Sequence, residues 1–148
     1  MVKKKEYMLV VDTREQKPLW KRGVKVHKLN AGDYSIEGYE DKIAIERKSL
    51  SDAYSTALSG HQRFKKELER AKDLDYFAIV IEGNFKQFIH KGFKGASFTR
   101  VSGFQICKIY FSWSIKHNIP IFFCDDRNHS KIAIKYLLEA YLNAHNFP

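Results

Sequence analysis

Residues 32–48 read GDYSIEGYEDKIAIERK, and this stretch decides the fold that the chain is expected to adopt. Its two arms, 33–36 and 42–48, are short and rich in β-prone residues, and a polar segment containing Gly38 connects them. Two such arms joined by a turn are typical of a β-hairpin. The sequence therefore predicts two neighbouring antiparallel strands here.

The side chains of the second arm fall on two faces, because they alternate along a strand. Ile43 and Ile45 lie on one face. Ala44, Glu46 and Lys48 lie on the other. The second face therefore carries a carboxylate and an amine side by side.

Further strand and helix patterns lie on either side of the hairpin. Before it, strands are predicted at Tyr7–Val11 and Val24–Leu29. After it, two helices are predicted, one from a Ser49 cap to about Leu58 and one with Phe64, Leu68 and Ala71 inward. A strand at Tyr76–Ile81, a helix at Ser97–His117 and a strand at Ile119–Phe123 follow. The last predicted element is a helix at Asn128–Ala144, with Ile132, Tyr136, Leu137 and Ala140 inward.

This order predicts an α/β fold with a mixed central sheet flanked by helices. Hairpins at the start require antiparallel pairs, and helical crossovers at the end require parallel ones. A chain of 148 residues without repeats or linkers suits one domain spanning residues 1–148.

The composition points to a polyanionic partner. The net charge is +9 with a pI near 9.5, which favours nucleic acid or an acidic membrane surface over a neutral ligand. A basic protein without such a partner is the plainer interpretation. The two cysteines form no C-x-x-C pair and the histidines no H-x-x-x-H pair, which argues against zinc or His-metal sites.

No membrane or secretion signal is recognisable. Met1–Lys5 is basic but has no cleavage region after it, and the apolar run Met8–Val11 is far too short to span a bilayer. We therefore expect no membrane partner and a cytoplasmic (nucleoid-associated) or nuclear location.

Asp33, Glu46 and Lys48 form a pattern suited to cleaving phosphodiester bonds. The reaction needs a hard cation such as Mg²⁺, which prefers carboxylate oxygens and keeps several waters. It also needs an attacking water, which a lysine can orient as a point charge or base. Asp33 and Glu46 would hold the metal and Lys48 would address the water. Arg47 should point its side chain to the opposite face and offer its backbone carbonyl as a third ligand.

Each of these residues also has a structural interpretation. An acid two residues before a lysine on a strand usually marks a solvated edge, because such short motifs match often by chance. Asp33 after Gly32 is typical of a turn. Asp12 at a strand end is typical of a cap.

The residues around Asp33, Glu46 and Lys48 help to decide between the catalytic and the structural interpretation. Residues 11–15 read VDTRE, residues 32–34 read GDY, and residues 45–52 read IERKSLSD. This set resembles the nuclease domain of the XPF/Hef family, within the PD-(D/E)XK superfamily, whose pattern is V-D-x-R-E, then G-D, a gap and E-R-K-x-x-x-D. The resemblance continues through Gly60–Leu68 and Ile79–Gly83 and is softer beyond. It implies a restriction-endonuclease-like fold.

By position, the resemblance implies Asp33 and Glu46 as metal ligands and Lys48 as the catalytic lysine, with Mg²⁺ as cofactor and Mn²⁺ able to substitute. It adds Asp12 as a further acidic member of the site. The residues implied in support are Arg14, Glu15, Arg47 and Asp52. For Asp52 we favour a second interpretation, since Ser49–Asp52 also matches the capping box that starts a helix.

Basic side chains near these motifs are candidates for phosphate contacts, which set affinity and its salt dependence. The candidates of first choice are Lys21, Arg22, Arg63 and Lys66. Each is also compatible with a solvated surface charge. For Trp20, beside Lys21, we favour packing on its own loop over stacking on an unpaired base.

The segment Ser97–His117 carries more apolar residues than one face of a surface helix holds. The helix is therefore central, or part of it meets a partner. The resembled family dimerises through its nuclease domain, which implies a homodimer.

The expected function is a metal-dependent DNA endonuclease, with attack by an activated water and the 3′ oxygen leaving. The resemblance alone implies branched, flap or junction DNA and a place in DNA repair and recombination. No tandem helix-hairpin-helix domain follows and no helicase precedes. We therefore expect a small stand-alone bacterial or phage version, with a separate DNA-processing protein as a further partner.

Two alternatives differ in class. A catalytically inactive DNA-binding or scaffold subunit would keep the fold, but such subunits typically lose the acidic and lysine positions, and Asp33, Glu46 and Lys48 are all present. A basic RNA-binding protein would need neither Mg²⁺ nor Glu46.

Overall fold

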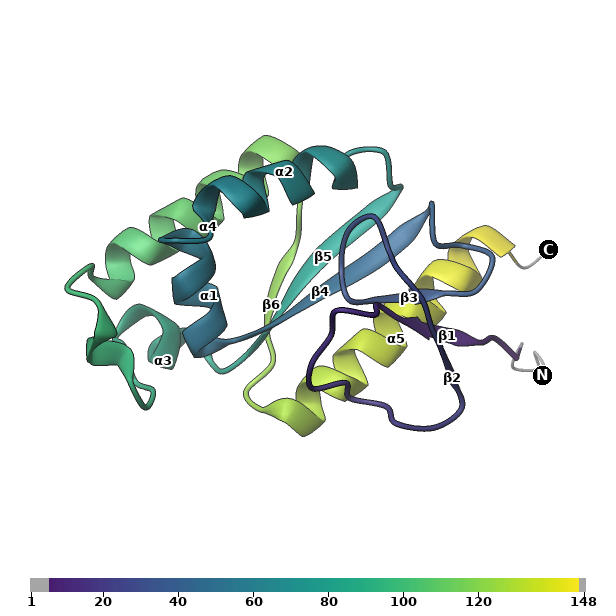
Figure 1. The fold of residues 1–148 in the computed structure, drawn as a ribbon, viewed down its shortest axis with the longest axis horizontal. Coiled ribbons are helices and arrows are strands. Elements are labelled where there is room, and N and C mark those ends of the chain that lie inside the picture. The colour runs from purple at the N-terminus through teal and green to yellow at the C-terminus, as the bar shows by residue number, and fades with distance from the viewer. Residues whose placement is uncertain (1–5, 147–148) are drawn as a thin grey trace.

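A twisted six-stranded sheet forms the centre of the molecule, with strand order β2-β1-β3-β4-β5-β6 (Figure 1). The computed structural model describes residues 6–146. The strands are β1 Leu9–Val11, β2 Val24–Val26, β3 Tyr34–Ile36, β4 Ile43–Ser49, β5 Tyr76–Glu82 and β6 Ile121–Phe123. The helices are α1 Leu50–Ala57, α2 His61–Ala71, α3 Phe85–Ile89, α4 Gly103–His117 and α5 Arg127–Asn146, with a short 3-10 helix η1 at Ala96–Phe98.

The sheet is mixed, as predicted. β3 pairs antiparallel with both β1 and β4, whereas β4, β5 and β6 run parallel to one another, and β1 is parallel to β2. The parallel strands are joined by helical crossovers: α1 and α2 connect β4 to β5, and α3, η1 and α4 connect β5 to β6. The α/β architecture expected from the order of elements is therefore confirmed.

The predicted hairpin is confirmed as β3 and β4, with Tyr34 opposite Ile45. The amide of Asp33 donates to the carbonyl of Ile45 at 2.9 Å, and the amide of Asp12 donates to the carbonyl of Asp33 at 2.8 Å. These two bonds hold Asp33 between the ends of β1 and β4. The residue expected in the site is thus fixed by its main chain on both sides.

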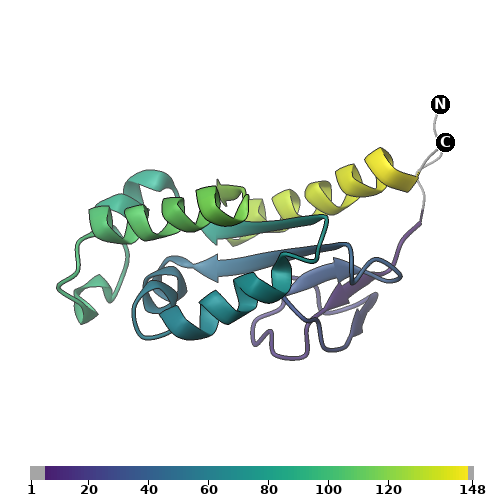
Figure 2. The same ribbon diagram turned by 90° about the horizontal axis from the view of Figure 1, so that it is seen from above.

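Helices cover both faces of the sheet (Figure 2). On one face α1, α2 and α4 pack over a core that includes Ala44, Ile79 and Ile81. On the other face α5 packs over Ile43 and Ile45. The predicted division of β4 into two faces is therefore correct.

Helix α1 matches its predicted start, and helix α2 matches its predicted inward face. Ser49 is the N-cap of α1, and its side chain accepts a hydrogen bond from the amide of Asp52 at 3.1 Å. In α2 the buried side chains are Phe64, Leu68 and Ala71. Helix α1 therefore begins directly at the end of β4, next to the strand that carries Glu46 and Lys48.

The long helix predicted at Ser97–His117 is wrong in its first turns. Residues 96–98 form η1, Thr99 is extended with φ −134°, and α4 begins only at Gly103. The Ser102 side chain accepts from the amide of Gln105 at 3.2 Å, which caps the helix at that point. The predicted strands at the N-terminal end and at Ile119–Phe123 are likewise longer than the observed ones.

The inward face predicted for the last helix is also wrong. Ile132 and Tyr136 are 49% and 59% exposed, and Ala140 is exposed, whereas Leu137 is partly buried. The buried side chains of α5 are Ile134, Leu138, Tyr141 and Leu142. Both sets have helical spacing, so the choice between them depends on packing against β3, β4 and β5. Within residues 6–146 no helix has the combined length and apolar character needed to cross a membrane.

At Gly103 the first turn of α4 lies close against Ile89 and Tyr54. A Cβ added there would lie 2.1 Å from the carbonyl oxygen of Ile89 and 2.6 Å from the hydroxyl of Tyr54. We predict that Gly103→Ala lowers the stability by about 1–3 kcal/mol, because the backbone of Ile89 has to move. Urea unfolding followed by circular dichroism measures this. Gln105→Ala, on the exposed side of α4, is the control, and equal midpoints for the two variants would contradict the prediction.

Candidate active site

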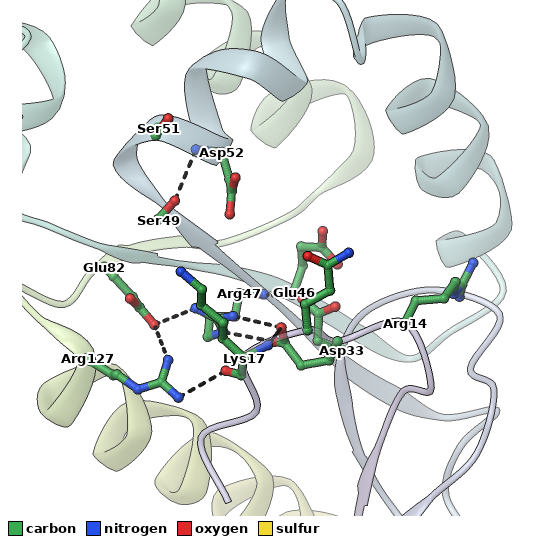
Figure 3. Close-up of a pocket in the computed structure, with 12 residues that line it drawn as sticks. Arg14, Lys17, Asp33, Glu46, Arg47, Ser49, Ser51, Asp52, Glu82 and Arg127 are labelled. Atoms are coloured by element: carbon green, nitrogen blue, oxygen red, sulfur yellow. Dashed lines mark hydrogen bonds and ion pairs between the residues drawn. The ribbon is translucent and has the colours of Figure 1, made fainter. Parts of the chain in front are cut away.

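A pocket of about 640 Å³ opens at the ends of the central strands (Figure 3). Side chains from the β1–β2 loop, the hairpin, the start of α1, the end of β5 and the start of α5 surround it. They are Arg14, Glu15, Gln16, Lys17, Asp33, Glu46, Arg47, Ser49, Ser51, Asp52, Glu82 and Arg127. Six of the residues singled out from the sequence therefore meet in one place: Arg14, Glu15, Asp33, Glu46, Arg47 and Asp52.

Asp33 lies at the start of β3 with its carboxylate directed at β4. Its Oδ2 accepts a hydrogen bond from the backbone amide of Arg47 at 2.8 Å. Burial raises the pKa of Asp33 well above its usual range, and the nearby carboxylate of Glu46 raises it further. Asp33 has no cationic side chain bonded to it among the described residues. Its charge is therefore poorly compensated, as expected for an acid that receives a cation.

Glu46 and Lys48 share a face of β4, as predicted. Lys48 Nζ lies 3.2 Å from Glu46 Oε2 and 2.8 Å from the hydroxyl of Thr56, and it sits 4.9 Å from the ring centre of Phe64. Burial alone would lower the pKa of Lys48, but the nearby carboxylates of Glu46, Asp33 and Glu67 together outweigh it, so this pKa is raised. Lys48 is therefore a charged ammonium held in a fixed position.

Glu46 also borders a second, smaller pocket of about 200 Å³ on the side of α2. This pocket is lined by Glu46, Lys48, Thr56, Gly60, Arg63, Phe64 and Glu67. Glu46 is thus the side chain common to both pockets. Its carboxylate is accessible to a ligand from either one.

The Arg47 side chain points to the opposite face, as predicted, into a network of buried ion pairs. Its guanidinium bonds both carboxylate oxygens of Glu15, at 2.7 and 2.9 Å, and Glu82 at 2.7 Å. The exposed fractions of the three side chains are 8%, 7% and 14%. Burial would raise the pKa of Glu15, but the hydrogen bonds from Arg47 hold it below its usual value. The network joins the β1–β2 loop, β4 and β5.

Arg127, which the sequence analysis did not single out, closes the same side of the pocket. Its guanidinium donates to the carbonyls of Lys17 and Pro18 at 3.0 and 2.9 Å and lies 3.9 Å from Glu82. These contacts fasten the β1–β2 loop to the first turn of α5. No signal near Arg127 in the sequence indicates this role, since Lys17 and Pro18 are 110 and 109 residues away.

Asp12 is fully engaged by its neighbours. Its Oδ1 accepts from the amide of Leu29 at 2.7 Å, and its Oδ2 accepts from the amide and the Nε of Arg14 at 3.0 and 2.8 Å. Burial acts to raise the pKa of Asp12, yet these bonds keep it below the usual value. Asp12 therefore fixes the turn after β1, and its membership of the catalytic set stays a prediction.

Asp52 lies at the pocket rim in the first turn of α1. Its amide is the group that Ser49 caps, so the helix-start interpretation is confirmed for Ser49. No Glu or Gln occupies position 52, and the full reciprocal capping box is absent from this helix start. The Asp52 side chain is exposed and faces the pocket, where it remains a candidate supporting residue.

The predicted DNA-binding residues do not form one surface around the pocket. Arg63 lines the small pocket with Glu46 and Lys48, whereas Lys66 is exposed elsewhere on α2. Lys21 borders a separate hollow of about 340 Å³ beside β2. Arg22 is exposed in the loop before β2.

Trp20 packs within the fold, as favoured, but against β3 and α5. Its ring stands edge-on to Tyr34 with centroids 5.4 Å apart, and Lys131 Nζ lies 5.3 Å from the centre of the Trp20 ring.

Glu67 is the residue of the site that the sequence analysis missed. Its carboxylate lines the small pocket beside Glu46, and its Oε2 is buried with no hydrogen-bond partner. Burial, followed by the charge of Glu46, raises the pKa of Glu67 to about 8. A signal was present: Glu67 follows Phe64 by three residues and precedes Ala71 by four, so it lies on the inward stripe of α2.

The chemistry of these donors fits a hard divalent cation. Asp33, Glu46 and Glu67 supply carboxylate oxygens, and one oxygen of Glu67 is buried without a hydrogen-bond partner. Among residues 6–146 no three acidic, His or Cys side chains converge closely enough to hold a metal together. Mg²⁺ commonly uses only one or two carboxylates and keeps waters for the rest of its shell.

Removing the charge at the centre of the ion-pair network should unfold the domain readily. We predict that Arg47→Met lowers the free energy of unfolding by about 3–5 kcal/mol, because Glu15 and Glu82 stay buried without their cation. Chemical denaturation measures the loss. The matched control is Lys72→Met, which removes the exposed pair with Glu69 and should leave the midpoint unchanged. A loss for Arg47→Met no larger than for the control would contradict the prediction.

The chain matches one protein family and is similar to solved structures. The ERCC4 domain matches residues 11–137, and no curated protein matches. XPF from Aeropyrum pernix has a similar fold, with a TM-score of 0.67 and 21% identity over 95% of this chain and 65% of that one. XPF from Aeropyrum pernix in complex with DNA gives a TM-score of 0.66 and 22% identity over 97% of this chain and 68% of that one.

The chain thus spans about two thirds of the length of these structures, and at such identities the likeness concerns the fold. The match of the ERCC4 domain shows more than the fold, because it is a match to a family and covers well over half of the chain. It includes the hairpin, α1 and α2. It confirms the resemblance to XPF-type nuclease domains that the VDTRE, GDY and ERK motifs indicate. This protein belongs to the ERCC4 domain family.

Proposed function

We propose that this protein is a Mg²⁺-dependent endonuclease that hydrolyses phosphodiester bonds in DNA. The observation that carries the proposal is the meeting of Asp33 and Glu46 with the fixed ammonium of Lys48. Proteins with an ERCC4 domain are typically metal-dependent nucleases. An inactive scaffold subunit would be expected to lack Asp33, Glu46 and Lys48, and all three are present here.

In this proposal Asp33 and Glu46 hold the cation, together with the carbonyl of Arg47. Bound Mg²⁺ would supply the positive charge that a phosphodiester needs as negative charge develops during its hydrolysis. Mn²⁺, which takes similar oxygen ligands, would substitute. Lys48 stays protonated, so it acts through its charge and its donors, orienting the attacking water or a phosphate oxygen.

The surrounding residues orient this group. Thr56 and Glu46 fix the Lys48 ammonium from two sides, and Arg63, which lines the small pocket, would contact a phosphate. The Arg47 network holds β4 in place beneath them. Asp12 and Arg14 keep the turn after β1 in shape.

For the substrate we propose branched, flap or junction DNA, in repair or recombination. A related structure, XPF from Aeropyrum pernix, is a complex with DNA, and the net charge of +9 suits a polyanionic partner. Lys21, Arg22, Arg63 and Lys66 are proposed to contact the DNA backbone. A separate DNA-processing protein is proposed as a partner that adds substrate selection.

Cleavage assays test the proposal directly. Purified protein is incubated with labelled flap, fork, Holliday-junction and duplex DNA, and with RNA of matched shape, in Mg²⁺ or EDTA. We expect cleavage of branched DNA in Mg²⁺ only, reduced at least about 100-fold in Glu46→Gln and in Lys48→Met. DNA binding should persist in both variants.

The control for this assay is Glu69→Gln, on the exposed side of α2, which should cut like the wild type. DNA binding without cleavage in Mg²⁺ or Mn²⁺ would instead support a scaffold subunit. Preference for RNA without dependence on Glu46 would support an RNA-binding protein.

We further propose that the protein forms a homodimer through the β6 edge of the sheet. β6 is the last strand, flanked by α4 on one face and α5 on the other (Figures 1 and 2). Large apolar side chains are exposed on all three elements: Phe111, Ile115, Phe122, Ile132 and Tyr136. An exposed apolar surface beside an open strand edge favours association, and a second copy supplies a matching surface.

Light scattering coupled to size-exclusion chromatography tests the dimer. We expect a dimer for the wild type and a monomer for Ile115→Asp, whose side chain is 84% exposed. Val26→Asp is the control, because Val26 is 63% exposed but lies on β2 at the opposite edge of the sheet. A wild-type monomer at micromolar concentration would refute the proposal.

A further inference from the structure

Glu67 has an environment that its place on α2 does not explain. One of its carboxylate oxygens is buried and has no hydrogen-bond partner, although a buried polar atom without a partner usually destabilises a fold. The Glu67 carboxyl group otherwise bonds Glu46 and the backbone of Gly32, and it lines the small pocket with Glu46, Lys48 and Arg63. Glu69, two residues later on the same helix, shows the ordinary case, an exposed carboxylate paired with Lys72.

The acids around Glu67 are unevenly paired with cations. Lys48 is ion-paired with Glu46, whereas Asp33 and Glu67 form no ion pair with a lysine or arginine side chain among residues 6–146. A divalent cation would supply the partner that these two carboxyl groups lack. On the opposite face Arg47 is ion-paired with both Glu15 and Glu82.

We propose that Glu67 helps to hold the divalent cation on the α2 side of Glu46 by binding one of its waters through the unpartnered oxygen. This rests on the proposed function, since it concerns the cation that Asp33 and Glu46 hold. Glu46 lines both pockets, so it connects the two acidic positions. Among residues 6–146 no three acidic side chains converge on one point, but Mg²⁺ keeps several waters, and one of these can reach Glu67.

The position of Glu67 has a structural consequence for the site. Asp33 and Glu46 come from the hairpin, whereas Glu67 comes from the middle of α2. A cation held by Glu46 and, through a water, by Glu67 therefore links β4 to α2, the helix that also carries Arg63. Cation binding and placement of a phosphate-contacting arginine would then be coupled through one helix.

Cation affinity measured without DNA tests this inference. Free Mn²⁺ is followed by electron paramagnetic resonance as it is titrated with the whole protein, and Mg²⁺ competition gives the Mg²⁺ affinity. We expect Glu67→Gln, which keeps the shape and removes the charge, to weaken Mn²⁺ binding about tenfold or more. The Mn²⁺ affinity of Glu67→Asp should lie between those of the wild type and Glu67→Gln. Aspartate keeps the carboxylate, but its side chain is one methylene shorter and holds the carboxylate further from the cation. Glu69→Gln is the matched control and should bind like the wild type.

The outcomes separate this inference from the proposed function. Wild-type affinity in Glu67→Gln, with binding lost in Glu46→Gln, would overturn the role of Glu67 and leave the nuclease site intact. No Mn²⁺ binding by the wild type would overturn both. Circular dichroism establishes that the variants are folded. If Glu67→Gln does not fold, the Mn²⁺ affinity of Glu67→Asp is used instead. An affinity equal to that of the wild type then overturns the inference, and a weaker affinity supports it.

Discussion

The guanidinium of Arg47, buried between Glu15 and Glu82, joins three segments that are far apart in the sequence. Such a group is stable only while its partners remain, since an unpaired buried charge is costly. Arg47 stands on β4 between Glu46 and Lys48, and alternation along the strand sends those two side chains to the opposite face. The Arg47 amide also holds the Asp33 carboxylate. The proposed catalytic group thus takes its orientation from one ion-pair network.

The acidic residues around this network fall into two classes. Asp12 and Glu15 bond to arginine side chains, which keep their pKa values low, and these acids stabilise the fold. Asp33 and Glu67 are bonded to no arginine or lysine side chain among the described residues, and burial beside Glu46 raises their pKa values. Perturbed carboxyl groups that a fold leaves uncompensated are common at functional sites. The division separates structural acids from those available to a cation.

Local signals in the sequence were sufficient for much of this arrangement. The alternation in residues 42–48 predicted both faces of β4, Ser49 predicted the start of α1, and the apolar run at 76–81 predicted β5. The apolar pattern predicted the wrong inward face where two sets of residues had the same helical spacing. In α5 the stripe through Ile132 and Tyr136 and the stripe through Ile134 and Leu138 have the same spacing, and contact with the sheet selects the second.

The sequence by itself determined the fold class, the family motifs and the shared face of Glu46 and Lys48, because each depends on spacing along a strand or helix. Only the tertiary structure decided which charges meet. The partners of Arg47 lie 32 and 35 residues away, and Glu67 reaches Glu46 from a different element. Pairing and burial depend on how elements pack against one another, so no local pattern specifies whether an acid is satisfied or left without a partner.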